Sequence, residues 1–119
     1  MNQLLYVFVG GGLGSAIRYL IGKLVEKLGT FSFPIHTFFS NVLSCLLVGL
    51  FLYFFLPKNE QYGNYRNFVI VGVCGGLSTF STFSFELLTI LKSGNFFLAV
   101  AYMLLSLATC IGVLYFFAK

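Results

Sequence analysis

The chain has 119 residues, of which 59% are hydrophobic and only 8% are charged. A soluble domain carries roughly a quarter charged residues, so this composition excludes an ordinary soluble domain. The apolar residues fall into four runs, and each is longer than the roughly 20 residues with which a helix crosses the bilayer. The predicted spans are residues 4–25, 34–56, 68–91 and 96–117. We therefore predict an all-α integral membrane protein that forms a single transmembrane domain, with no room for a catalytic domain.

Other classes of protein fit these four runs poorly. The helices of a soluble four-helix bundle have one apolar stripe and a charged opposite face, whereas these runs are apolar nearly all round. Strands of a membrane barrel show alternating segments of about ten residues. A cleaved signal peptide is not expected at the start, because the first run is too long and contains Arg18.

The first span has a face of small residues. Gly10, Gly14, Arg18 and Gly22 recur every four positions, and small residues at this spacing let another helix approach closely. Arg18 is costly against lipid, so it either snorkels to the surface or caps carbonyl groups of a neighbouring helix. The glycine-rich run 10–14 is not a phosphate loop, because no strand precedes it and no Lys-Ser/Thr pair follows it.

The second span has polar residues on one face, namely Thr37, Asn41 and Ser44. The Asn41 amide cannot be satisfied by its own helix. It either bonds to another helix as a structural link or lines a polar path. His36 stands alone at the start of this span, and we expect an interfacial residue rather than a metal ligand.

The third span contains the sequence Gly75-Gly76-Leu77-Ser78-Thr79 near its middle. Paired glycines beside hydroxyl residues favour a kink or a break, so we predict a third helix that is broken in the middle of the membrane. A break frees carbonyl oxygens, and such oxygens suit a small cation such as Na⁺.

After the predicted break, phenylalanines and hydroxyls alternate. Phe80 and Phe83 share one helix face, and Ser81 and Ser84 share the adjacent face. The edge of a phenylalanine ring is electropositive, so rings and hydroxyls together can contact a small anion without holding it too tightly. The alternative is that the rings only fill the core or face lipid. Five hydroxyl residues between positions 78 and 84 are more than a lipid-facing helix would tolerate: Ser78, Thr79, Ser81, Thr82 and Ser84.

The fourth span carries Tyr102, Ser106 and Thr109 on one face, which is either a helix interface or a continuation of a polar path. Glu86 is the only acidic residue inside a predicted span, and we expect it to reach the membrane interface from near the end of its helix. The cysteines lack metal-ligand spacing and are expected to be small packing residues: Cys45, Cys74 and Cys110.

Cations are balanced between the two sides of the predicted membrane. Lys58, Arg66 and Lys119 lie on the side of the N-terminus; Lys23, Lys27 and Lys92 lie on the other side, with Arg18 deeper in the first span. The positive-inside rule needs an excess on one side to set the orientation, and there is none. Either short loops balance by chance, or the protein inserts in both orientations and works as an antiparallel dimer.

Three stretches carry a resemblance to a known family: residues 10–19, the region of Asn41 with Gly49, and residues 72–84. Over essentially its whole length the chain resembles the Fluc (CrcB-type) fluoride channel family. The resemblance implies an antiparallel, dual-topology homodimer in the cell inner membrane, with two pores that passively export fluoride and so reduce its toxicity. It implies no enzymatic activity. The partners would be fluoride, a second copy of the chain and the lipid bilayer, with no nucleic acid.

The resemblance also implies roles for individual residues. A structural Na⁺, which is not transported, would be held by main-chain oxygens of Gly75 and Ser78 at the dimer centre. The family often has Thr at position 78, but a backbone ligand should tolerate Ser. The implied pore residues, together with the neighbouring hydroxyls, are Asn41, Phe80, Ser81, Thr82, Phe83, Ser84, Tyr102, Ser106 and Thr109.

Two other functions fit some of these features. A small multidrug-resistance-type exporter, which exchanges cations for protons, has similar length and topology but needs an acidic residue in its first span. The first span here has none, and Glu86 is misplaced for that role. A non-transporting assembly subunit would not require a glycine-broken third helix with clustered hydroxyls.

Overall fold

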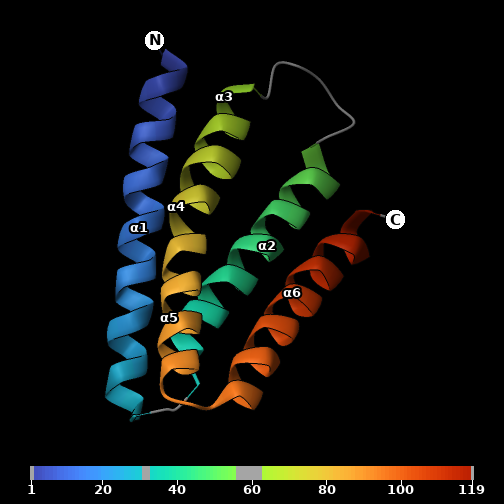
Figure 1. Cartoon of the computed structure of the whole chain (residues 1–119). Helices are drawn as coiled ribbons and strands as arrows, with labels where there is room; N and C mark the ends of the chain where they lie inside the picture. Colours follow the sequence, from blue (N-terminus) through green and yellow to red (C-terminus); the bar gives the residue numbers. More distant parts are fainter. Residues whose placement is uncertain (1, 31–32, 56–62, 119) are drawn as a thin grey trace.

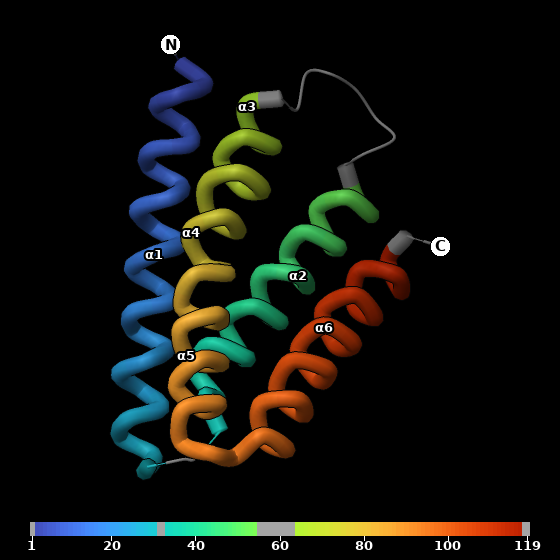
Figure 2. The backbone as a smooth tube through the Cα atoms, viewed as in Figure 1, coloured from blue at the N-terminus to red at the C-terminus, as the bar shows by residue number. Residues whose placement is uncertain are grey.

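Four long helical stretches run alternately in opposite directions, so that both ends of the chain lie toward the same side (Figure 1, Figure 2). The computed structural model describes residues 2–30, 33–55 and 63–118. The third stretch is composite, because a π-helical segment and a short gap divide it. The elements are α1 (Asn2–Leu28), α2 (Ile35–Phe55), α3 (Gly63–Arg66), η2 (Asn67–Cys74), α4 (Gly75–Leu77), α5 (Phe80–Lys92) and α6 (Phe96–Ala118).

All four stretches are long and apolar enough to cross a membrane, which confirms the prediction of four membrane-spanning helices in an all-α chain. Their candidate spans are Asn2–Leu28, Ile35–Phe54, Asn64–Lys92 and Phe96–Phe117. The predicted spans agree with these bounds to within four residues; position 56, the predicted end of the second span, lies outside the described residues. The organisation as a single domain stays a prediction.

Helix α1 lies directly against η2 and α4, and glycines on both sides make this approach possible (Figure 1). A methyl group added to Gly14 would meet the carbonyl oxygen of Val73, and one added to Gly76 would meet the carbonyl oxygen of Gly11. The glycine face predicted for the first span is therefore a packing face. Gly12, on another side of α1, has open space around it.

One cluster of buried apolar residues lies between α5 and α6. It consists of Phe83, Ile90, Ala99 and Tyr102, with partly buried residues from α2 and the preceding loop packed against it. Large apolar side chains on the outer faces are exposed, Phe8 and Phe97 among them. Exposed apolar surface on every long helix is what a chain surrounded by lipid requires.

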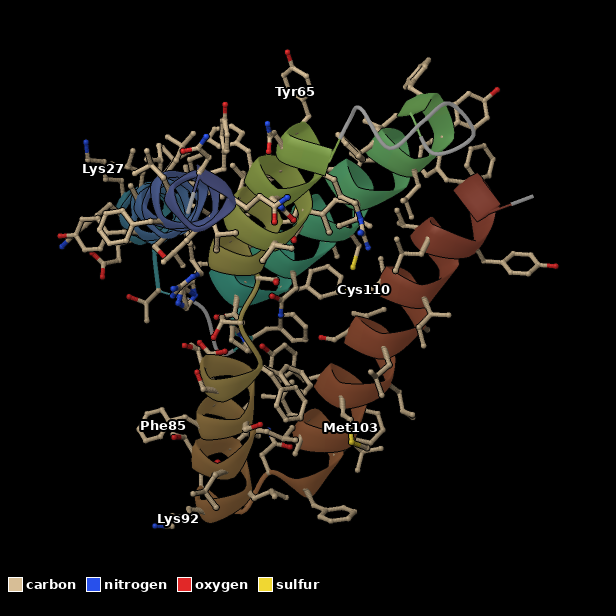
Figure 3. The ribbon with its side chains drawn as sticks, turned by 90° about the horizontal axis from the view of Figure 1, so that it is seen from above. Lys27, Tyr65, Phe85, Lys92, Met103 and Cys110 are labelled. Atoms are coloured by element: carbon tan, nitrogen blue, oxygen red, sulfur yellow. The ribbon has the colours of Figure 1, made fainter. Side chains whose placement is uncertain are left out.

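The third stretch is interrupted between α4 and α5. Ser78 has φ −85° and ψ 157°, and Thr79 has φ −154° and ψ 123°, so both residues are extended rather than helical. Figure 3 shows the thin connection that joins the two helical parts. The depth of this interruption in a bilayer stays a prediction.

Candidate functional site

The interruption is held by side chains that take over two backbone amides. The Thr79 amide donates to Oδ1 of Asn41 at 2.9 Å, and the Thr82 amide donates to Oγ1 of Thr79 at 3.2 Å. In an uninterrupted helix these two amides would bond to the carbonyl oxygens of Gly75 and Ser78, four residues earlier. The same two carbonyls were predicted as cation ligands, and they have lost their usual helical partners.

The carbonyl oxygen of Cys74 fixes the end of this region onto α2. It accepts hydrogen bonds from the Ser78 amide at 3.0 Å, from Oγ of Ser78 at 2.8 Å and from Oγ of Ser44 at 2.8 Å. In the same peptide group, the Gly75 amide donates to the carbonyls of Gly72 and Ile70, which is the irregular bonding of a π-helix ending. Sequence reasoning did not find this π-helical segment, although such segments are frequent at functional sites.

Arg18 reaches the same region from α1. Its Nε donates to the carbonyl oxygen of Gly76 at 3.0 Å, so of the two alternatives it caps a carbonyl of a neighbouring helix. Its charge is thereby held beside the interruption. It also lines an open pocket of about 540 Å³ between α1 and the start of α2, together with Lys23, His36 and Thr82.

A second polar cluster lies where α2, α5 and α6 meet. Oε2 of Glu86 accepts from the Thr37 hydroxyl at 2.8 Å, and Oε1 accepts from the Tyr102 hydroxyl at 3.0 Å. Nε2 of His36 lies 3.5 Å from the same Oε2 atom. The Glu86 side chain is 17% exposed, and the expectation that it reaches the membrane interface stays a prediction. Its two hydroxyl partners on other helices hold it between them.

The two phenylalanines predicted for the pore lie side by side but differ in burial. Their ring centroids are 6.0 Å apart, and the Phe83 ring is also 4.9 Å from the Tyr102 ring. Phe83 is 8% exposed, whereas Phe80 is 77% exposed on the surface of the single chain. One ring is therefore part of the core, and the other is available for a further contact.

The hydroxyl residues predicted for the pore are distributed over two helices. On α5, Ser81 and Ser84 are exposed and Thr82 is half-buried, while Thr109 is half-buried on α6. Ser106 on α6 is buried, and so is Ser40 on α2. Among the described residues, the hydroxyl oxygens of Ser40 and Ser106 have no hydrogen-bond partner.

These two unpartnered hydroxyls lie on facing helices. Ser106 follows Tyr102 by one turn of α6, and Ser40 follows Thr37 by about one turn of α2. Thr37 and Tyr102 meet at the carboxylate of Glu86, so the faces that carry the two serines are turned toward each other. Ser40 is not among the pore residues predicted from the sequence.

Comparison with known proteins places the chain in a family. Residues 5–117 match the family described as CrcB-like protein, Camphor Resistance (CrcB). A protein of Phocaeicola vulgatus named fluoride-specific ion channel FluC is 45% identical over 79% of this chain and 77% of its own length. Proteins with the same name from Flavobacterium psychrophilum and Azobacteroides pseudotrichonymphae are 40% and 36% identical, over 89% and 96% of this chain and 86% and 92% of their own lengths. The chain is a multi-pass membrane protein that belongs to the CrcB family, whose named relatives are ion channels and not enzymes.

Proposed function

We propose that this chain forms a fluoride-specific channel of the cell inner membrane, through which cytoplasmic fluoride leaves passively. The observation that carries the proposal is the pair of buried hydroxyls without an acceptor, Ser40 and Ser106, on facing helices. A buried hydroxyl without a partner costs about 1–3 kcal/mol. Fluoride accepts hydrogen bonds and donates none, so it can satisfy such donors.

The groups around these hydroxyls suit an anion that must also leave. Asn41 uses only its oxygen to bond the Thr79 amide, and its NH₂ group remains a donor. The Phe83 ring adds an electropositive edge without a full charge. Several weak contacts of this kind favour conduction over tight binding. We assign the remaining predicted pore residues to the same path: Phe80, Ser81, Thr82, Ser84, Tyr102 and Thr109.

The interruption can also hold a cation, which we propose is a structural Na⁺ that is not transported. The carbonyl oxygens of Gly75 and Ser78 have lost their helical partners, and free backbone carbonyls are suitable Na⁺ ligands. Two oxygens from one chain are too few to enclose a cation. A second copy would supply an equal pair, and Gly75 is exposed on the single chain and open to such a contact.

The same reasoning favours an inverted second copy. Lys and Arg are balanced across the predicted membrane, so neither orientation is preferred. We therefore propose an antiparallel homodimer in which each chain contributes to both pores and to the shared Na⁺ site. The exposed Phe80 ring would be covered by the partner in this arrangement.

Liposomes that contain the purified protein, K⁺ and fluoride test the proposed function. Addition of valinomycin in Na⁺ buffer should start fluoride release, which a fluoride electrode measures, while chloride stays inside. A proton-coupled cation exporter of the multidrug type, or a non-transporting subunit, would release no fluoride, and silent liposomes would overturn the proposal.

A pair of variants tests the role of the ring. Phe83→Ile removes the buried aromatic edge, and fluoride release should slow at least tenfold. Phe85→Ile is the matched control, since Phe85 is 68% exposed and points away from α6 (Figure 3), and release should stay near the wild-type rate. Equal rates for all three proteins would mean that Phe83 only fills the core.

A further inference from the structure

The carboxylate of Glu86 is an obstacle on the path proposed for an anion. Its two oxygens accept the hydroxyl hydrogen bonds of Thr37 and Tyr102. One helical turn further along α2 and α6 lie the unpartnered hydroxyls of Ser40 and Ser106. A charged carboxylate at this point repels fluoride and competes with it for the same donors. A positive charge beside the carboxylate reduces its repulsion of fluoride.

His36 is placed to supply this charge. Its Nε2 lies 3.5 Å from Oε2 of Glu86, and its ring packs against α1, where Cδ2 would lie 3.5 Å from a methyl group on Gly22. The imidazole is 41% exposed on the single chain and lines the open pocket together with the charged side chains of α1. Histidine is the side chain that ordinarily gains or loses its charge between pH 5 and pH 8.

The other charged and titratable groups near His36 are engaged elsewhere. On α1, the groups that line the pocket are Arg18, Tyr19, Lys23 and Glu26. On α5, Glu86 faces the imidazole, and on α6 the Tyr102 hydroxyl bonds to the Glu86 carboxylate. Arg18 is bonded to the carbonyl of Gly76. Lys23 lies 3.7 Å from Glu26 and 5.5 Å from the centre of the Tyr19 ring. Among the described residues, His36 is the cation-forming group recorded within ion-pair distance of Glu86.

We propose that His36 is a positioning residue that binds a proton. By its effect on the charge of Glu86, it sets the rate at which fluoride passes. When the imidazole is protonated, its charge compensates the carboxylate, competes with Thr37 for the same oxygen, and lowers the repulsion that fluoride meets. When the imidazole is neutral, the carboxylate is uncompensated and keeps both donors. The inference rests on the proposed function, and it predicts faster passage in acid.

Fluoride currents across planar bilayers test this inference, with equal fluoride and equal pH on both sides. The current that protein-free bilayers carry at each pH is subtracted, because it includes leakage of hydrogen fluoride. Between pH 8.0 and pH 5.5 the current of the wild-type protein should rise about two- to fivefold, as expected for an ion pair between partly exposed groups.

Two substitutions at the same position separate charge from shape. His36→Gln should carry the wild-type current of pH 8.0 at both pH values. His36→Lys, which is charged throughout, should carry nearly the acid current at both. The matched control is Lys23→Gln, which removes another cation of the same pocket and should retain the wild-type ratio between the two currents.

The outcomes distinguish the inference from the function on which it rests. An absence of fluoride current at every pH would overturn the proposed function. A current that is present but has the same pH ratio in the wild type and in His36→Gln would overturn the inference alone. A ratio that is lost in Lys23→Gln would also overturn it, because the pocket as a whole would then be responsible.

Discussion

Asn41 connects the two halves of the site through one amide group. Its oxygen accepts the Thr79 amide and so stabilises the interruption, while its nitrogen remains able to donate to an anion. Sequence reasoning left a structural bond and a polar path as alternatives for this residue. The structure shows the structural bond, and the two roles are compatible because they use different atoms.

Substitutions at Asn41 can separate these roles. Asn41→Asp keeps an oxygen for the Thr79 amide but removes the donor and adds a negative charge. We expect a folded protein whose fluoride release from liposomes is at least tenfold slower. Asn41→Ala loses the oxygen as well and should unfold more easily, by about 1–3 kcal/mol. Wild-type release by Asn41→Asp would show that the amide nitrogen does not serve fluoride.

The contacts of Glu86 could not be predicted from the sequence, for a physical reason. Its hydroxyl partners Thr37 and Tyr102 lie 49 and 16 positions away along the chain. The polar residues themselves were evident, but the sequence does not state how the helices are rotated against one another. The signal that could have predicted these contacts is a single acidic residue in one span, which needs polar partners, together with polar residues in two other spans.

At the scale of elements, the lengths and faces of the helices were predictable, whereas their irregularities were less so. Apolar runs determine a span, and the glycine spacing of α1 indicated its packing face. The π-helical bonding of η2 depends on which carbonyls the Gly75 amide reaches, namely Gly72 and Ile70. Composition carries no signal of that choice. The extended pair Ser78–Thr79 lies within the stretch that the paired glycines marked.

The glycine contact between α1 and η2 yields a prediction about stability. Gly14→Val should lower the free energy of unfolding by roughly 1–3 kcal/mol, because the added atoms meet the backbone of Val73 rather than a movable side chain. Gly12→Val on the same helix is the control, since nothing lies within 4 Å of an added methyl group there. Thermal unfolding in detergent, followed by circular dichroism, measures both. Equal melting temperatures would contradict a tight contact at Gly14.

At the scale of the molecule, the balanced cations predict that two orientations are needed. Three additional lysines on one side of the membrane should force every copy into one orientation. We expect cells with such a variant alone to remain sensitive to fluoride, and cells that also make the oppositely biased variant to recover. Growth in fluoride medium measures both, and immunoblots check that each protein is present. Full resistance from one biased variant alone would refute the antiparallel dimer.

The way the interruption is held has a consequence for how this chain can change over generations. Amides of Thr79 and Thr82 are kept out of the helix by side-chain oxygens, those of Asn41 and Thr79. Replacement of these oxygens by alkyl groups returns the amides to the carbonyls of their own helix, which is the ordinary resting state of an apolar segment. Damage of this kind lowers stability by only a few kcal/mol at most, but it removes the contacts that hold the interruption and with it transport. A copy freed from selection should therefore lose transport before it loses its insertion in the membrane.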